Sequence, residues 1–278
     1  MTIQNIHQLG PVALFLGIET ETWSLAQFQQ AAAAAKALGI SSLLIKIADG
    51  GKPPWYGSLG GWKAVLSAVN QTGILAIPYT FCYGDLFGAL DAEISTLIAA
   101  MEYCGLVVAD IEATWGGHSD WAQRMSAALG PVPGLFGVTT LADPLPPMQN
   151  LGVVLNALKP STNFWLPQVY SDYLGSVYHA QFDPLQLPYF PVLNLGTDFG
   201  SNDVMQIAQN AKSPVIVLWE YQAAIGAYAN TVKSLVAQFS QPNVADLKAQ
   251  IALLSAQNAK LSGALQQILG IAKGIQAF

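Results

Sequence analysis

Two carboxylic acids stand two residues apart at the end of an apolar run, in the segment Val-Val-Ala-Asp-Ile-Glu-Ala-Thr-Trp of residues 107–115. Side chains two apart in a β-strand point to one face, so we expect Asp110 and Glu112 to leave the strand end side by side. Glycosidic bond cleavage uses such a pair: an acid protonates the leaving oxygen, and a second group stabilises the charge developing on the sugar. The other interpretation is a pair bound to Lys46 or to backbone amides.

The roles of the two acids follow from their surroundings. Partial burial and a neighbouring carboxylate would raise the pKa of Glu112, which fits the general acid. Asp110 would supply the negative partner or orient a substrate amide. The close spacing favours a retaining over an inverting outcome, because inversion needs room for a water molecule.

The composition excludes several classes of function. The chain has 278 residues, enough for one large domain with an appendage, and is 52% apolar, 10% charged and of net charge −6. No basic block is present, so we expect no nucleic-acid partner. No apolar run is long enough to predict a transmembrane segment. The first ten residues contain no secretory signal, so an extracellular or virion-associated location would need another exit route.

Metal and cysteine chemistry find no support in the sequence. The histidines are scattered and show no metal-ligand spacing, so we expect neither a metal nor a cofactor. Cys82 and Cys104 form no disulfide framework and are predicted to be buried thiols.

Eight short apolar runs that alternate with helical patterns must position the two acids. Such alternation predicts a (β/α)8 TIM-like barrel, and runs apolar almost throughout fit a parallel sheet buried on both faces. A doubly wound open sheet is the alternative, although no Gly-rich phosphate loop follows the first strand. The predicted strands are residues 12–19, 42–48, 74–80, 106–112, 135–140, 164–170, 189–195 and 214–220.

The active site of such a barrel lies at the carboxyl ends of its strands. Polar and aromatic residues gather at these ends, and aromatic rings offer surfaces on which the apolar faces of sugars stack. We therefore predict catalytic roles for Glu112, Asp110 and Glu19. The predicted substrate-binding residues are Lys46, Asp49, Tyr79, Trp115, Gln168, Tyr170, Trp219, Glu220 and Tyr221.

The last part of the chain has a period of its own. Leucine or isoleucine recurs every seventh residue from Leu247 to Ile275, and a second series runs from Val244 with Asn258 among its members. This heptad pattern predicts that residues 244–275 form a coiled coil that makes the protein a homo-oligomer. We therefore divide the chain into a barrel, residues 1–241, and an oligomerising helix, residues 242–278. The alternative is a last amphipathic helix packed on the barrel.

Residues 12–222 resemble the glycoside hydrolase family 25 barrels, which are lysozymes (N-acetylmuramidases). The family's Asp-x-Glu on the fourth strand is matched by Asp110-Ile111-Glu112. Weaker matches occur in chain order at Gly17-Ile18-Glu19-Thr20, Ile45-Lys46-Ile47-Ala48-Asp49-Gly50, Pro78-Tyr79-Thr80-Phe81, Gln168-Val169-Tyr170 and Trp219-Glu220-Tyr221.

The resemblance implies that Glu112 is the general acid and that Asp110 orients the substrate's N-acetyl group, whose carbonyl acts as internal nucleophile. The sequence departs from the family in three places: Glu19 replaces an aspartate, Glu220 replaces a glutamine, and a further aspartate has no equivalent in residues 222–232. Two functions therefore stay open. One is a retaining glycoside hydrolase acting on peptidoglycan-like or other aminosugar polymers. The other is a glycan-binding or structural module of a phage tail or surface assembly, oligomerised by its coiled coil.

Overall fold

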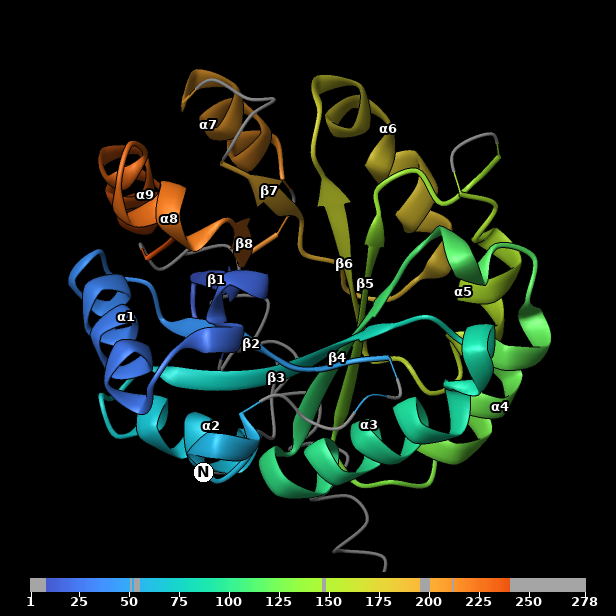
Figure 1. Ribbon diagram of the computed structural model, residues 1–278. Coiled ribbons are helices and arrows are strands. Elements are labelled where there is room, and N and C mark those ends of the chain that lie inside the picture. The colour runs from blue at the N-terminus through green and yellow to red at the C-terminus, as the bar shows by residue number, and fades with distance from the viewer. Residues whose placement is uncertain are drawn as a thin grey trace, which may run out of the picture. The chain divides into compact units, whose positions relative to one another are not determined.

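The eight predicted strands form a closed parallel barrel in the computed structural model, which describes residues 9–50, 52, 56–146, 149–195, 201–211 and 213–240. Each strand pairs with its neighbours in chain order, and β1 closes the ring against β8. Helices lie outside the ring of strands (Figure 1). This is the (β/α)8 fold that the sequence predicts. Among the described helices, none combines the length and apolar character that a membrane crossing requires.

The strands are β1 Val12–Leu16, β2 Ser42–Asp49, β3 Leu75–Cys82, β4 Leu106–Ile111, β5 Leu135–Leu141, β6 Phe164–Val169, β7 Val192–Asn194 and β8 Ile216–Trp219. The α-helices are α1 Leu25–Ala37, α2 Trp62–Asn70, α3 Leu90–Cys104, α4 Ser119–Leu129, α5 Gly152–Leu158, α6 Asp172–Phe182, α7 Ser201–Asn210, α8 Tyr221–Ile225 and α9 Ala229–Phe239.

Alternation along the strands divides the core into two layers. One set of side chains fills the barrel interior, as Leu44, Ile77, Val108 and Phe164 do. The other set packs outward beneath the helices. Residues that continue the interior set beyond its last apolar layer must therefore face the open carboxyl end of the barrel, where polar side chains can meet a ligand.

A local sequence signal marks where the first helix begins. At the start of α1, Ser24 Oγ accepts a hydrogen bond from the Gln27 amide at 3.3 Å, and Gln27 Oε1 accepts one from the Ser24 amide at 2.8 Å. This reciprocal capping box satisfies two backbone donors that a helix start leaves unpaired.

Several strand ends differ from the prediction. β1 stops at Leu16 because the chain turns into a short 3-10 helix, η2, at Ile18–Thr22. β7 has only three residues, and Tyr189 joins the sheet through an isolated bridge to Trp165. Glu112 follows the last residue of β4 instead of belonging to it. The apolar runs continue past the last ladder hydrogen bond, so hydrophobicity alone overestimates the length of these strands.

The chain divides after Phe239, where the barrel ends. The predicted heptads of residues 244–275, and with them the predicted coiled coil, lie outside the described residues. Cys82 and Cys104 are buried free thiols, as predicted.

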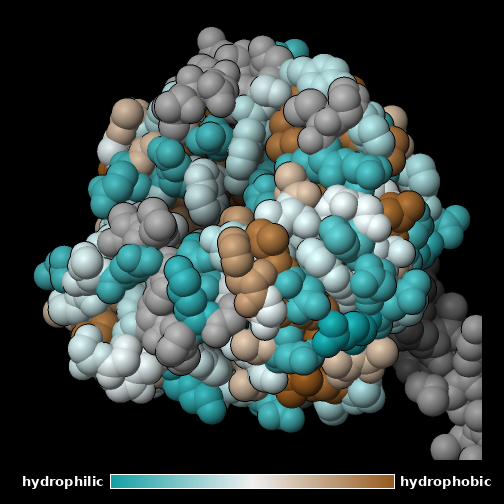
Figure 2. Space-filling model, turned by 45° about the vertical axis from the view of Figure 1, so that its right-hand side comes forward, coloured by the Kyte–Doolittle hydropathy of each residue, from teal (hydrophilic) through white to brown (hydrophobic). Residues whose placement is uncertain are grey.

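Hydrophilic residues predominate on the face of the molecule in Figure 2, and hydrophobic residues form only small groups on it. This is the ordinary condition of a folded surface. The large hydrophobic residues exposed in the described part of the chain are Leu86, Phe87, Tyr103, Leu145, Val153 and Tyr173.

Candidate active site

A cavity of about 490 Å³ opens at the carboxyl ends of the strands. It brings together residues of β2, β3, β4, β6 and β8 that lie far apart in the sequence. The lining residues are Gly17, Lys46, Tyr79, Phe81, Asp110, Glu112, Gln168, Tyr170, Trp219, Glu220, Tyr221 and Gln222. All predicted site residues except Glu19, Asp49 and Trp115 are therefore part of one cavity.

The two carboxyl groups lie on one face, as the spacing predicts. Asp110 belongs to β4, and Glu112 keeps an extended backbone with φ −110° and ψ −175° although the strand has ended. Both side chains line the cavity. Gln168 Nε2 donates a hydrogen bond of 2.9 Å to Asp110 Oδ1, and Gln149 Nε2 donates a longer one of 3.4 Å to Glu112 Oε2. The side-chain amides of Gln168 and Gln149 thus hold the pair.

Burial raises the pKa of both acids. The pKa of Asp110 lies well above its ordinary value because burial penalises the charge and because Glu112 is close; Lys46 and the Gln168 amide act in the opposite direction. Burial also raises the pKa of Glu112, and hydrogen bonds from Gln168 and Gln149 reduce the rise. Two coupled carboxyls in such surroundings do not both ionise readily, so the pair retains a proton that it can donate.

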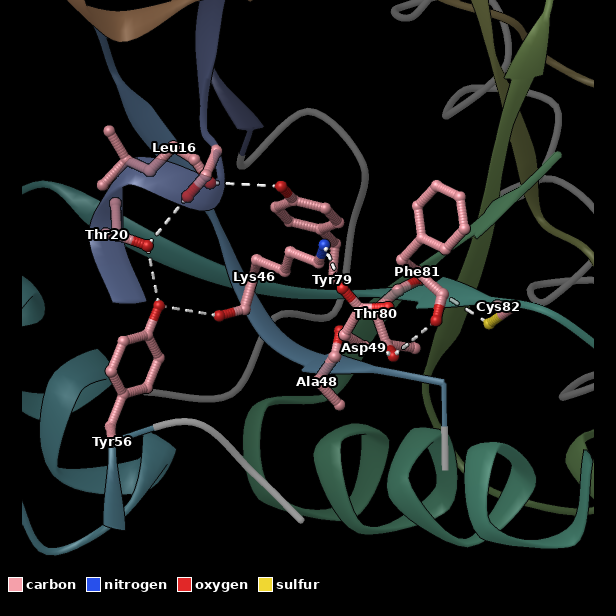
Figure 3. Close-up of polar contacts among 11 residues, drawn as sticks. Leu16, Thr20, Lys46, Ala48, Asp49, Tyr56, Tyr79, Thr80, Phe81 and Cys82 are labelled. Carbon is pink, nitrogen blue, oxygen red and sulfur yellow. Dashed lines mark hydrogen bonds and ion pairs between the residues drawn. The ribbon is translucent and has the colours of Figure 1, made fainter. Parts of the chain in front are cut away.

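Lys46 and Asp49 form an ion pair of 3.0 Å beside the acids. A register irregularity between Lys46 and Ala48 returns Asp49 to the strand face that Lys46 occupies. Figure 3 shows the two side chains meeting above β2. The Lys46 ammonium also lies 5.2 Å from the centre of the Phe81 ring. These contacts place a fixed positive charge at the cavity wall, where it opposes the rise in the pKa of Asp110.

Hydrogen bonds fix the backbone at the ends of β1 and β2 (Figure 3). Thr20 Oγ1 donates to the Gly17 carbonyl at 2.9 Å and contacts the Tyr56 hydroxyl at 2.8 Å. The Tyr56 hydroxyl lies 3.0 Å from the Lys46 carbonyl, to which it donates. The network is buried, and it fixes the backbone of Gly17, which forms part of the cavity wall.

Aromatic rings form the floor of the cavity. The Phe15 ring packs against Tyr79 and Trp219, with ring centres 4.9 and 5.3 Å apart, respectively. The Tyr79 hydroxyl donates to the Leu16 carbonyl at 3.2 Å, which fixes its ring. Rings held in this way offer a pre-organised surface to an apolar ligand face.

Tyr170 lies beside the acids and responds to their charge. Burial raises the pKa of its hydroxyl well above the ordinary value, and Asp110, Glu112 and Glu220 raise it further. The phenol therefore stays protonated, so it is a neutral hydrogen-bond donor inside the cavity at physiological pH.

Glu220 occupies a strained backbone position at the cavity, with φ 77° and ψ 91°. A non-glycine residue at positive φ costs on the order of 1–3 kcal/mol, and such residues cluster at functional sites. The turn lets the chain pass from β8 into α8 while Trp219, Tyr221 and Gln222 all reach the cavity.

Three predicted residues have other placements. Trp115 is fully buried, and its Nε1 donates to the Cys82 carbonyl at 2.9 Å, so its ring offers no face to a sugar. It packs against Trp121 of α4 with ring centres 5.8 Å apart, which corrects the expected stacking role. Asp49 lines a neighbouring cavity. Glu19 lies in η2, and its side chain is outside what the structure describes.

Four residues of the site were not predicted from the sequence. Phe81 follows Tyr79 by two and so shares its strand face, a spacing that alone could have identified it. Gly17 and Gln149 reach the site from loops and Gln222 from the start of α8, positions for which strand alternation gives no rule. Among the described residues, no three His, Cys, Asp or Glu side chains gather in a way that could hold a metal ion.

Neither the models of protein families nor the curated proteins match the sequence. Solved structures do match the fold. An endo-1,4-β-mannanase from Rhizomucor miehei has a TM-score of 0.58 and 12% identity, over 84% of this chain and 95% of that one. Domain 2 of a thermostable chitinase from Pyrococcus furiosus has a TM-score of 0.56 and 10% identity, over 83% and 94%. A GH36 α-galactosidase from Geobacillus stearothermophilus has a TM-score of 0.52 and 10% identity, over 83% and 41%.

These likenesses concern the fold. At identities of 10–12% they show that the chain shares the barrel of these glycoside hydrolases. Because one fold carries many chemistries, a function must be argued from the residues of the cavity.

Proposed function

We propose that this protein is a retaining glycoside hydrolase that acts on peptidoglycan-like or other aminosugar polymers. The observation that carries the proposal is the Asp110/Glu112 pair, whose carboxyl groups have raised pKa values inside an aromatic-lined cavity of about 490 Å³. Glycosidic cleavage at neutral pH requires one acid that can still donate a proton, and a raised pKa favours this. The fold shared with a mannanase and a chitinase supports the same class of substrate.

In the proposed reaction, Glu112 donates its proton to the glycosidic oxygen, which keeps the electron pair of the breaking carbon–oxygen bond. The carbonyl oxygen of the substrate's N-acetyl group attacks the anomeric carbon, and Asp110 accepts a hydrogen bond from the amide N–H. The Glu112 carboxylate then takes a proton from water, which opens the cyclic intermediate and returns the configuration to that of the substrate. The Tyr170 hydroxyl supplies a further neutral donor within the same cavity.

The aromatic lining gives the sugar its place. Trp219 and Tyr221 from the β8 end line the cavity together with Tyr79 and Phe81 from β3. A ring held between such surfaces is positioned by apolar contact, while Lys46 and the cavity acids bind its polar groups. This combination of apolar stacking and polar contacts suits a neutral polysaccharide and requires no cofactor.

Replacing Glu112 with glutamine tests the proposal. We expect Glu112→Gln to lower the release of reducing ends from purified cell walls and from chito-oligosaccharides by about 10²–10⁴-fold, because the amide cannot donate a proton of suitable acidity. Glu102→Gln is the matched control, since Glu102 is an exposed residue of α3 outside the cavity. Circular dichroism and thermal unfolding should be the same for all three proteins. Hydrolysis that survives in Glu112→Gln would exclude this mechanism.

A glycan-binding or structural module of a phage tail or surface assembly is the second candidate. The specific observations are the heptads of residues 244–275 and the replaced acids Glu19 and Glu220. Oligomeric display would raise a weak glycan affinity through avidity, and it would suit a virion-associated or extracellular location. Under this proposal the wild type and Glu112→Gln bind insoluble cell walls equally well in a pull-down, and neither releases product.

A further inference from the structure

A second cavity, of about 400 Å³, lies next to the first at the ends of β2 and β3. Its wall contains Asp49, Tyr83 and Phe87, with Lys52 at its edge. Phe87 belongs to a 3-10 turn, η4 at Leu86–Gly88, which precedes α3. The reaction described above uses none of these residues.

Two contacts join the cavities. Phe81 lines the first cavity and Tyr83 the second, and their ring centres are 4.9 Å apart. Lys46 lines the first cavity and Asp49 the second, and they form the 3.0 Å ion pair. Aromatic and polar surface therefore continues from the acids toward the outside of the barrel along β2 and β3. Figure 3 shows that Phe81 and Asp49 come from these neighbouring strands.

Phe87 is the most exposed large hydrophobic residue described, at 89% of its full accessible surface. The loop that precedes Phe87 is anchored to α3. Glu93 of α3 is buried and accepts hydrogen bonds of 2.6 Å from the Tyr83 amide and 3.1 Å from the Gly84 amide. An aromatic ring that lines a cavity and is exposed in this way is a surface for stacking, since covering it with an apolar ligand face removes its apolar area from water.

We propose that this second cavity is a distal subsite that binds further sugar residues of the same chain, with Phe87 and Tyr83 as stacking rings and Asp49 as hydrogen-bond acceptor. The inference rests on the proposed glycan-directed function and specifies its ligand as a β-linked N-acetylglucosamine-type oligosaccharide several residues long. A polymer bound across both cavities would be cleaved within the chain, away from its ends.

The test compares a long and a short ligand in the Glu112→Gln protein, in which binding can be measured without turnover. Isothermal titration with chitohexaose and chitobiose gives the ratio of the two dissociation constants. We expect Phe87→Ala to lower the preference for chitohexaose by about three- to tenfold, the range that one stacked ring supports. Phe87→Tyr keeps a ring and should keep the preference. Tyr103→Ala is the matched control, because Tyr103 is an exposed ring near the other end of α3.

The outcomes separate the two proposals. A preference for chitohexaose that is unchanged in Phe87→Ala overturns the subsite, even if the wild type hydrolyses the ligand. The same holds if no chito-oligosaccharide binds. A length-dependent affinity that requires Phe87, together with a wild type that releases no reducing ends, supports the subsite and refutes the hydrolase.

Discussion

At the scale of the residue, Gln168 is one of the groups that set the charge of the site. Its Nε2 donates to Asp110 Oδ1 at 2.9 Å and also approaches Thr139 Oγ1 at 3.3 Å, which fixes the side-chain amide between β4 and β5. Hydrogen bonds from Gln168 lower the pKa of Asp110 and of Glu112, against the stronger effect of burial. The proton available for catalysis thus depends on a residue that need not touch the breaking bond.

We predict that Gln168→Leu moves the pH dependence of hydrolysis to higher pH. The amide donor stabilises the ionised carboxyls, so its loss disfavours the charged form and raises the pKa of both acids further. The pH dependence of kcat/KM, measured from about pH 3 to about pH 9, reports these pKa values in the free enzyme. Gln149→Leu is the comparison: it removes only a 3.4 Å contact to Glu112 and should move the profile less. An unshifted profile in Gln168→Leu would show that the amide does not set the acidity.

At the scale of the element, Glu93 connects α3 to the loop that follows β3. Its carboxylate accepts hydrogen bonds from the Tyr83 and Gly84 amides. Burial raises its pKa to about 7, those two hydrogen bonds act against the rise, and the nearby charges of Asp49 and Asp85 add to it. The loop of the proposed distal subsite therefore rests on a carboxyl group that titrates close to neutrality.

A raised carboxyl pKa has a defined consequence for stability. The folded protein holds this proton up to about pH 7, whereas the unfolded chain releases it near pH 4.5. The stabilisation that this proton gives the folded protein is therefore complete below pH 4.5, and it is lost as the pH rises through 7. We predict that the unfolding free energy of wild type, relative to Glu93→Gln, falls by about 3 kcal/mol between pH 4 and 8. Urea unfolding of both proteins across this range measures it; parallel pH curves would contradict the prediction.

The packing between β5 and β6 requires a residue without a side chain. A Cβ atom built on Gly137 would lie 2.2 Å from Cζ of the Phe164 ring, which is buried inside the barrel. We predict that Gly137→Ala destabilises the protein by about 1–3 kcal/mol, the usual cost of overpacking a core. Thermal unfolding measures the loss. Adding Phe164→Leu should restore part of it, and a destabilisation that the second change leaves unaltered would point to a cause other than this contact.

The site could be predicted from the sequence where strand alternation applies. The spacing of Asp110 and Glu112 was enough to place both at the cavity, since the backbone stays extended through both residues. It failed for Trp115, because a 3-10 turn directly after Glu112 rotates the chain and buries the ring. The irregularity in β2 that turns Asp49 toward Lys46 has no signature in residue types either, because it depends on pairing with β3. Tertiary hydrogen bonding decides such positions.

At the scale of the whole molecule, the barrel and the last part of the chain pose separate questions. The cavities proposed to bind the glycan both belong to the barrel, since the described residues that line them lie within residues 17–222. If residues 244–275 form the predicted coiled coil, they would set the number of barrels presented to a polymer, and through it the avidity.

We predict that the full chain forms a homo-oligomer and that Leu261→Asp abolishes it. Leu261 is a central member of the leucine and isoleucine series, and a charge at such a position in a helical interface would be buried without a partner. Light scattering at micromolar concentration should give a multiple of the 29.5 kDa chain for the wild type and a single chain for the variant. Lys260→Asp is the control, since Lys260 stands outside both heptad series.

Because the cavities belong to one barrel, turnover of soluble chito-oligosaccharides should be the same in monomer and oligomer, whereas affinity for insoluble cell walls should fall in the monomer. A monomeric wild type would refute the coiled coil and leave the barrel chemistry untouched.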